Sequence, residues 1–212
     1  MKIVPAVLTD KLDELRRMVS EAEFCELLHI DIMDGRFVPT KSITAVDLAS
    51  CKTKIPMEAH LMVENPEDYI KPFKSAGAMR FIFHFEATDK PEGVIEEIKD
   101  NGLEAGLAIN PDTSLKSIKH LLEKIDYLLL MSVYPGFYGA KFVGGVLDKA
   151  VKVKRLKPEL LLGMDGGIKA DNIKIIKEAG VDLADVGSYI FKADNPEVAY
   201  NELKRLIGCE VQ

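Results

Sequence analysis

The segment LLLGMDGGIKADNIKIIKEAGVDLADV, residues 160–186, contains one complete strand–helix–strand unit. Both of its ends are short apolar runs, which are typical of strands buried on both faces of a parallel sheet. Between them, Ile173 and Ile176 form an apolar helical face, and Gly180 follows as a left-handed helix terminator. The segment therefore predicts a β-strand, a crossover helix and a second parallel strand.

The same pattern recurs along the chain on both sides of this segment. Short apolar runs alternate with segments of helical periodicity, and several of these helical segments end in a glycine. The predicted strands are 3–8, 27–33, 57–63, 81–85, 105–109, 127–133, 160–164 and 183–186. The predicted helices are 10–23, 43–52, 66–76, 92–101, 114–124, 145–155, 171–179 and 196–207.

The helix at 66–76 has the clearest end signals. Asn65 is a capping residue, Pro66 suits the first helical position, and Gly77 is a terminator. Pro72 lies inside this helix and is expected to kink or shift it.

Eight strand–helix units in 212 residues, about 26 residues per unit, predict a compact (β/α)₈ TIM barrel that forms a single domain over 1–212. Active sites of such barrels lie at the C-terminal ends of the strands. An open doubly wound sheet is the structural alternative, but its G-x-G-x-x-G fingerprint is missing after the first strand.

The charges are scattered, with 28 Lys and Arg against 34 Asp and Glu, a net charge of −6. This balance argues against nucleic acid or an anionic membrane as the main partner. No apolar run approaches the roughly 20 residues that a membrane-spanning helix needs, and the N-terminal stretch reaches Asp10 without a signal-peptide core. We therefore expect a cytoplasmic protein. The three cysteines form no Cys-x-x-Cys pair, so we expect free thiols.

Polar side chains stand near the ends of three predicted strands. His29 and Asp31 alternate on the second, His60 is on the third, and Asp165 follows the seventh. A single His on an apolar strand is more often a hydrogen-bonded core residue, but four ionisable groups in one barrel mouth would be costly to bury unpaired. A divalent metal would satisfy all four, and this donor set suits zinc, iron, manganese or cobalt. Asp31 and Asp165 would then serve as paired acid–base groups, one on each face of a substrate.

Glycine-rich turns follow the last three strands, at 136–139, 166–167 and 187–188. Turn geometry alone explains isolated glycines, but the loops after strands 7 and 8 of such barrels commonly bind phosphate. A phosphorylated substrate is the favoured interpretation.

Three methionines, Met33, Met62 and Met131, occupy similar positions near strand ends. They form either an apolar collar around the metal or ordinary core packing. His84 and Glu86, at the end of the fourth strand, are further candidates for the site.

Several motifs together resemble the ribulose-phosphate 3-epimerase family, in the family's order and over nearly the whole chain. They are HIDIMDGRFVP at 29–39, HLMVENP at 60–66, MSVYPGF at 131–137, DGGI at 165–168 and GSYIF at 187–191. The resemblance implies an isomerase that interconverts D-ribulose 5-phosphate and D-xylulose 5-phosphate through a cis-enediolate, and a homo-oligomer, either dimer or hexamer.

The resemblance also implies roles for individual residues. The metal ligands would be His29, Asp31, His60 and Asp165, with Asp31 and Asp165 as the catalytic pair. The metal-capping residues would be Met33, Met62 and Met131. The substrate-binding residues would be His60, Gly136, Phe137, Tyr138, Gly139, Asp165, Gly166, Gly167, Gly187 and Ser188.

The chain departs from the family pattern around the sugar. Ala6 stands where the family usually has Ser, Thr40 stands in place of Asn, and the loop 134–140 carries Tyr134, Tyr138 and Ala140 in place of Asn, Gly and Gln. These changes leave three alternatives open.

The first alternative is the same chemistry on a hexulose 6-phosphate such as D-allulose 6-phosphate. The second is a phosphosugar-binding protein without turnover. The third is a barrel decarboxylase. Such an enzyme would need the Lys of an Asp-x-Lys motif, and this chain has Met33 in that position, two residues after Asp31.

Overall fold

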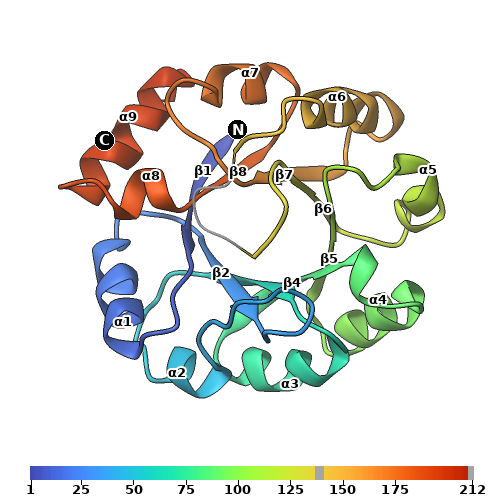
Figure 1. The fold of residues 1–212 in the computed structure, drawn as a ribbon, viewed down its shortest axis with the longest axis horizontal. Coiled ribbons are helices and arrows are strands. Elements are labelled where there is room, and N and C mark those ends of the chain that lie inside the picture. The colour runs from blue at the N-terminus through green and yellow to red at the C-terminus, as the bar shows by residue number, and fades with distance from the viewer. Residues whose placement is uncertain (137–140, 210–212) are drawn as a thin grey trace.

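Eight parallel strands close into a barrel in the computed structural model of the chain, which describes residues 1–136 and 141–209 (Figure 1). Each strand pairs with its neighbours in sequence, and β8 closes the barrel against β1. The strands are β1 Lys2–Val7, β2 Leu28–Met33, β3 Met57–Met62, β4 Ala78–His84, β5 Glu104–Ile109, β6 Tyr127–Met131, β7 Leu161–Asp165 and β8 Leu183–Val186. The predicted (β/α)₈ barrel is confirmed.

The helices form an outer ring around the strands (Figure 1). They are α1 Leu12–Glu21, α2 Ala45–Ala49, α3 Glu67–Ser75, α4 Pro91–Asp100, α5 Leu115–Ile118, α6 Val146–Leu156, α7 Ile173–Glu178, α8 Ser188–Phe191 and α9 Pro196–Leu206, with 3₁₀ turns η1 Phe85–Ala87 and η2 Lys119–Leu121. Every predicted helical segment overlaps one of these helices. The short α8, directly after β8, was not predicted.

Two helices, α2 and α5, fall furthest short of their predicted ranges. A capping box between Thr44 and Asp47 starts α2 at Ala45, so the predicted start at 43 is wrong. In the predicted helix 114–124, the α-helix ends at Ile118 and continues as the 3₁₀ turn η2. Ile118 and Leu121 are both buried at a spacing of three residues, which a 3₁₀ turn aligns on one side.

Helix α3 begins one residue later than predicted. Asn65 makes no side-chain cap and adopts a left-handed backbone with φ 50°, and Pro66 takes the capping position. Pro72 lies inside α3 and has no N–H to donate to the carbonyl of Asp68. The kink at Pro72 stays a prediction.

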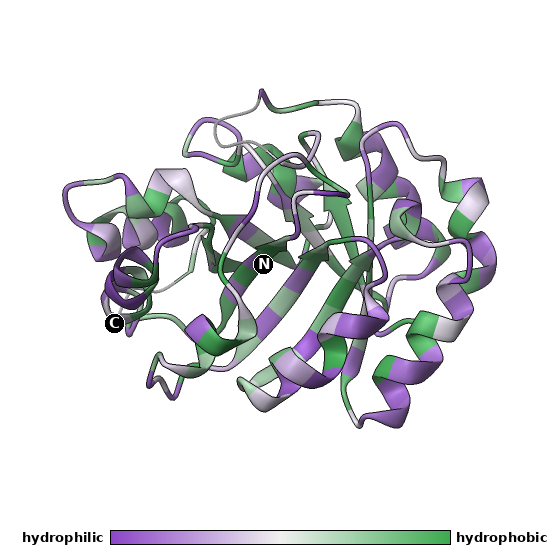
Figure 2. Cartoon of the chain, turned by 60° about the horizontal axis from the view of Figure 1, so that its bottom comes forward, coloured by the Kyte–Doolittle hydropathy of each residue, from purple (hydrophilic) through white to green (hydrophobic). Residues whose placement is uncertain are grey.

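The main apolar core lies between the barrel wall and the helices, where Leu15, Ile30, Leu61, Ile70 and Phe81 are buried. The opposite faces of the strands point into the barrel, and several of them carry polar groups. Figure 2 shows these hydrophilic bands interrupting the hydrophobic strands. These polar groups are thus held on strands that each pair with two neighbours.

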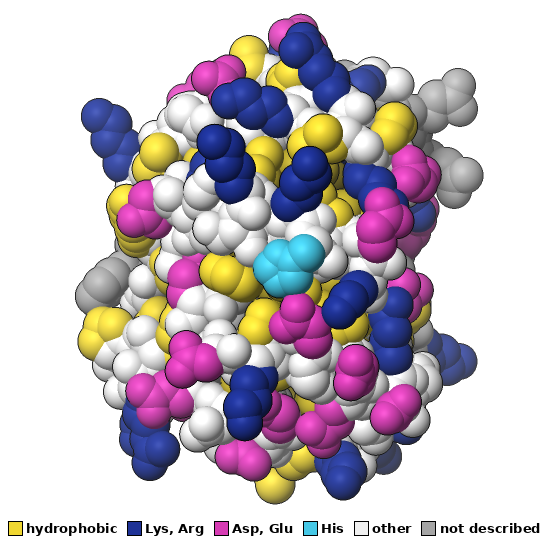
Figure 3. Space-filling model, turned by 90° about the vertical axis from the view of Figure 1, so that its right-hand side faces the viewer, with side chains coloured by type: hydrophobic (Ala, Val, Ile, Leu, Met, Phe, Trp, Pro, Cys, Tyr) yellow, Lys and Arg dark blue, Asp and Glu magenta, His cyan; other side chains and the backbone are white. Residues whose placement is uncertain are grey.

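The surface carries both signs of charge. On the face drawn in Figure 3, Lys and Arg side chains occur together with Asp and Glu side chains. Within the described ranges, no helix is long and apolar enough to cross a membrane. Cys25, Cys51 and Cys209 are free thiols, as predicted.

Candidate active site

Strand register brings the predicted polar side chains together inside the barrel mouth. Asp31 of β2 pairs in register with His60 of β3, and His29 lies two residues before Asp31 on the same inward face. Asp165 ends β7, which lies across the mouth from β2. Donor atoms of His29, Asp31, His60 and Asp165 all lie within 4.8 Å of one another, so the four residues converge as predicted.

The contacts centre on the Asp31 carboxylate. Its Oδ1 lies 2.9 Å from His60 Nδ1 and 3.3 Å from His29 Nε2. Asp165 Oδ2 approaches the same His60 nitrogen to 3.9 Å. The two carboxylates therefore reach toward one point from different walls of the barrel.

The two carboxyl groups have opposite pKa shifts. Burial pushes the pKa of Asp31 up, but the imidazoles of His29 and His60 outweigh it and hold the pKa below its usual range. Burial, and then the charge of Asp31, raise the pKa of Asp165 to about 7. Burial also lowers the pKa of His60 to about 4, so this imidazole is neutral at pH 7.

His29 is oriented by a buried carboxylate that the sequence analysis missed. Its Nδ1 lies 2.7 Å from Glu58 Oε1, and both side chains are fully buried. A hydrogen on Nδ1 then leaves Nε2 to face the cluster. Among the described residues this buried Nε2 has no hydrogen-bond partner, and a cation bound there would satisfy it.

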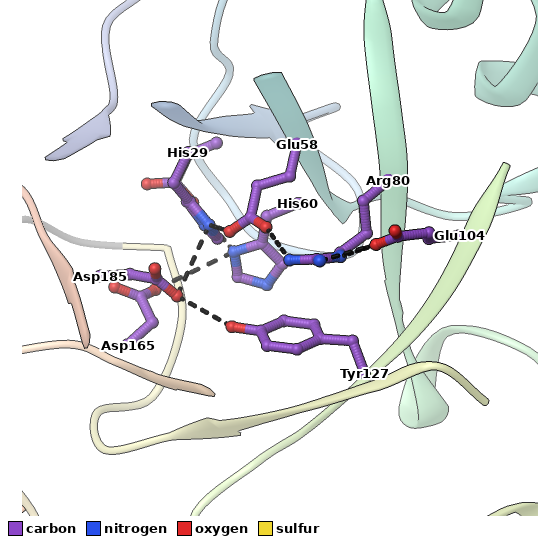
Figure 4. Close-up of polar contacts among 9 residues, drawn as sticks. His29, Glu58, His60, Arg80, Glu104, Tyr127, Asp165 and Asp185 are labelled. Atoms are coloured by element: carbon purple, nitrogen blue, oxygen red, sulfur yellow. Dashed lines mark hydrogen bonds and ion pairs between the residues drawn. The ribbon is translucent and has the colours of Figure 1, made fainter. Parts of the chain in front are cut away.

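A polar network continues beneath His29 (Figure 4). Glu58 Oε2 accepts a hydrogen bond from Arg80 at 2.7 Å, and Arg80 also pairs with Glu104 at 2.6 Å. The Arg80 guanidinium lies 4.7 Å from the centroid of the Tyr127 ring. The charge of Glu58 is thus balanced on both sides.

Asp185 and Tyr127 complete this network on the far side of the barrel. Asp185 Oδ2 lies 3.6 Å from His29 Nδ1 and 3.4 Å from the Tyr127 hydroxyl. Burial raises the pKa of Asp185 well above its usual range. Gly163 makes room for Tyr127, because a Cβ at position 163 would lie 1.6 Å from the Tyr127 hydroxyl.

The sequence contained a signal for these missed residues. Glu58 lies two positions before His60, so strand alternation directs both inward. Asp185 and Tyr127 lie within predicted apolar strands, where any polar group is unusual. The alternation rule that selected His29 and Asp31 would have found Glu58, Tyr127 and Asp185 if it had been applied to every predicted strand.

His84 and Glu86 lie beside the cluster. His84 Nε2 is 2.9 Å from His60 Nε2, and His84 Nδ1 is 3.3 Å from Glu86 Oε2. Both further candidates are therefore connected to a predicted metal ligand.

A cavity of about 70 Å³ is lined by two of the four predicted metal ligands, Asp31 and Asp165. Met33, Met62 and Met131 are buried and line it, together with Asp31 and Asp165. The methionines thus surround the carboxylates with apolar side chains.

The glycine-rich loops form another part of the cavity wall. The residues from these loops are Gly136, Gly166, Gly167, Gly187 and Ser188. At Gly166, φ is +111° and a Cβ would lie 2.4 Å from Val133, so only glycine fits. The predicted residues Phe137, Tyr138 and Gly139, and the substituted Ala140, lie outside the described residues.

The described departures from the family pattern occupy the same region. Ala6 lines the cavity and offers only a methyl group. The Thr40 hydroxyl donates to the carbonyl of Gly136 at 2.7 Å and ties the loop after β2 to the loop after β6. Tyr134 is more than half exposed.

A larger hollow of about 360 Å³ adjoins the cavity. The two share Leu8, Met33, Gly136, Gly187 and Ser188, and the hollow extends toward α1 and α8. The carboxylates of Asp31 and Asp165 line the cavity of about 70 Å³, and the hollow of about 360 Å³ extends the open space beside it.

Comparisons with known proteins agree with this geometry. A family model described as the ribulose-phosphate 3 epimerase family matches residues 2–191. The ribulose-phosphate 3-epimerase of Mycobacterium tuberculosis H37Rv is 38% identical over 213 residues, covering 98% of this chain and 93% of the relative. The ribulose-phosphate 3-epimerase of Aquifex aeolicus is 40% identical over 188 residues, covering 86% of this chain and 85% of the relative.

Among solved structures, KGPDC from Streptococcus mutans superposes with a TM-score of 0.75 at 15% identity, covering 97% of this chain and 96% of that one. This likeness shows the fold alone. The family match and the full-length relatives go further: the chain belongs to the ribulose-phosphate 3-epimerase family, a family of isomerases.

Proposed function

We propose that the protein epimerises C3 of a ketose phosphate in a metal-dependent reaction, interconverting D-ribulose 5-phosphate and D-xylulose 5-phosphate. The observation that supports this most strongly is the convergence of two carboxylates with opposite pKa shifts, Asp31 and Asp165, from different walls of the barrel. The names of the relatives support the substrate.

The donor set fits one divalent cation. The cation would be held by His29 Nε2, His60 Nδ1 and one oxygen each of Asp31 and Asp165. It would satisfy His29 Nε2, a buried atom that forms no hydrogen bond among the described residues. Zinc, iron, manganese and cobalt are the candidates. When bound, the cation polarises the substrate carbonyl next to C3 and offsets the repulsion between the two carboxylates.

Asp31 and Asp165 act as the catalytic residues on opposite faces of the substrate. One carboxylate takes the proton from C3, the electron pair enters the C2 carbonyl, and an enediolate results. The other group, protonated, delivers a proton to the opposite face of C3. A single carboxylate would return the proton to the same face, so epimerisation needs both.

The remaining cavity wall fits the rest of the substrate. Backbone groups at Gly136, Gly166, Gly167, Gly187 and Ser188 hold the phosphate, because glycine allows a phosphate to approach the main chain closely. Phe137, Tyr138 and Gly139, which lie outside the described residues, are proposed to bind the substrate as well. His60 contacts the sugar, and Met33, Met62 and Met131 restrict movement of the intermediate.

A hexulose 6-phosphate is the second candidate substrate. Ala6 leaves space and removes a hydroxyl at the cavity wall, and the adjoining hollow of about 360 Å³ offers room for one further carbon. The reaction at C3 would be the same.

Solvent exchange at C3 tests the function directly. Protein loaded with each candidate metal is incubated in deuterated water with pentulose and hexulose phosphates, and deuterium at C3 is followed by NMR. We expect exchange with D-ribulose 5-phosphate, and Asp165→Asn lowers the rate of epimerisation to D-xylulose 5-phosphate roughly 10²- to 10⁴-fold because one face loses its proton carrier. Asp171→Asn, an exposed change in the loop after β7, is the matched control.

The substrate panel separates the alternatives. Faster exchange with a hexulose 6-phosphate would replace the pentose assignment. Failure of every substrate to exchange with every metal would refute the proposed reaction. Binding of ligand by a protein that stays metal-free after loading would instead support a binding protein.

A further inference from the structure

The two imidazoles of the candidate metal centre present different nitrogen atoms to it. His29 presents Nε2 and His60 presents Nδ1 to the Asp31 carboxylate. The outer nitrogen of His29 contacts the carboxylate of Glu58 directly. The outer nitrogen of His60, Nε2, contacts another imidazole, that of His84, at 2.9 Å. The hydrogen position on His60 therefore depends on His84.

His84 in turn contacts a carboxylate. Its Nδ1 lies 3.3 Å from Glu86 Oε2, and the side chain of Glu86 is 23% exposed. Glu86 Oε1 accepts the backbone N–H of Asn110 at 2.9 Å and the hydroxyl of Thr113. Burial raises the pKa of Glu86, but hydrogen bonds from His84, Asn110 and Thr113 outweigh it and lower the pKa. Glu86 is thus an ionised group that only accepts hydrogen bonds.

Packing holds the middle of this chain in place. The His84 side chain is fully buried and its ring stacks on His60, with centroids 5.0 Å apart and planes 22° apart. The Phe37 ring also packs against His84, with a centroid distance of 4.9 Å. His84 therefore has little freedom to turn away from either partner.

We propose that Glu86 acts through His84 to fix the ring hydrogen of His60 on Nε2, which leaves His60 Nδ1 as the metal-ligating atom. Glu86 and His84 are positioning residues in this inference, which rests on the proposed metal-dependent function. A neutral imidazole carries one ring hydrogen. A hydrogen on His84 Nδ1 faces Glu86, so the lone pair of His84 Nε2 accepts the hydrogen of His60 Nε2.

With a cation bound at His60 Nδ1 the reversed arrangement would be disfavoured, whereas without a cation the Asp31 carboxylate, 2.9 Å away, favours a hydrogen on that atom. A hydrogen on His84 Nε2 would donate to His60 and place the hydrogen of His60 on Nδ1, where it blocks the ligand atom. It would also leave the lone pair of His84 Nδ1 facing the Glu86 carboxylate at 3.3 Å. Carboxylate contacts of this kind commonly orient metal-ligating histidines, and here one acts through an intervening ring.

Two substitutions of His84 separate hydrogen bonding from packing. His84→Gln keeps an acceptor oxygen near the position of Nε2, whereas His84→Phe keeps the ring and removes the acceptor. We expect His84→Phe to weaken zinc binding roughly 10- to 100-fold, and His84→Gln to restore most of it. Competition with a chromophoric chelator measures the zinc affinity. His120→Gln, an exposed change at a histidine paired with Glu92, is the control.

Nitrogen-15 NMR of the zinc-loaded wild type gives the spectroscopic test. We expect hydrogens on His60 Nε2 and His84 Nδ1, and a loss of the single His84 form in Glu86→Gln. A hydrogen on His84 Nε2 would overturn the relay, and so would zinc affinity in His84→Phe equal to that of the wild type. In both cases the proposed function still holds if the wild-type protein is active and binds zinc. A wild type that binds no divalent cation refutes the metal site and the relay together.

Discussion

At the scale of single residues, Asp31 and Asp165 are chemically alike but surrounded differently. Asp31 contacts two imidazoles, whereas Asp165 is buried near the charge of Asp31 and has a pKa raised to about 7. In the metal-free protein, Asp31 is therefore ionised at neutral pH, whereas Asp165 gains and loses its proton near pH 7. Environments that separate two carboxyl pKa values in this way are typical of acid–base pairs.

The raised pKa of Asp165 predicts a pH-dependent gain in stability from Asp165→Asn in metal-free protein. The folded state holds this proton more tightly than the unfolded state, whose Asp pKa is about 3.9. Stability from this group is thus lost as pH rises from about 4 toward 7. We expect the variant to gain on the wild type over that range, by up to about 1.4 kcal/mol per pKa unit.

Denaturant unfolding at a series of pH values, with chelator present, checks this expectation. Asp171→Asn, which replaces an exposed carboxylate, should show no such trend. An equal gap between the wild type and Asp165→Asn at all pH values would mean that neither burial nor the charge of Asp31 raises the pKa of Asp165 in the folded protein.

At the scale of elements, the loop between β5 and α5 is held by a lysine from a distant helix. Lys149 of α6 donates to the backbone carbonyls of Asn110, Pro111 and Thr113, at 3.3, 2.6 and 2.5 Å. Burial lowers the pKa of Lys149. The same loop donates to Glu86, so α6 indirectly supports the hydrogen-bond chain that ends at His60.

Replacing this lysine should therefore destabilise the loop. We expect Lys149→Met to lower the free energy of unfolding by about 1–3 kcal/mol, because three carbonyls lose their donor. Amide hydrogen exchange should become faster at Thr113. Lys152→Met, on an exposed position of the same helix, is the matched control. Equal effects of the two variants would show that the carbonyl contacts contribute nothing.

The ends of elements were less predictable than their existence. The apolar periodicity placed a helix at 114–124, but it does not distinguish an α-helix from an α-helix that ends in a 3₁₀ turn. Asn65 is a residue type that commonly caps helices, but its backbone is left-handed and Pro66 occupies the capping position instead. The exact ends of a helix depend on which hydrogen-bond partners its terminal backbone groups find in the folded protein.

At the scale of the whole molecule, the barrel interior is unusually polar. Such interiors are commonly filled by branched apolar side chains. Here His29, Glu58, Arg80 and Asp185 are buried among them, and most of the apolar core lies outside the barrel wall. The buried His29 Nε2, which forms no hydrogen bond among the described residues, and the crowded carboxylates cost stability that a bound cation would recover.

Metal binding should therefore stabilise the fold as a whole. A site filled at about 100 times its Kd adds roughly 2.7 kcal/mol to the free energy of unfolding. We expect zinc, manganese, cobalt or iron(II) to raise Tm, and a chelator to reverse the effect. Magnesium, which prefers oxygen ligands, should raise Tm less. An unchanged Tm with all four metals would contradict a site at this cluster.

Other expectations at this scale stay predictions. The cytoplasmic location, the single domain over 1–212 and the homo-oligomeric state each need a direct measurement, and light scattering would decide between a monomer, a dimer and a hexamer.

The alternation of strands and helices, the four donor residues and the family could all be predicted from the amino-acid sequence. These features depend on periodicity and on motifs that are local in the chain. Which polar groups meet, in contrast, is a property of the folded barrel. The pairs His29 with Glu58 and Asp31 with His60 depend on the register between β2 and β3, and Asp185 reaches His29 because β8 closes the barrel against β1. Register and closure come from packing of the whole molecule, so no single segment encodes them.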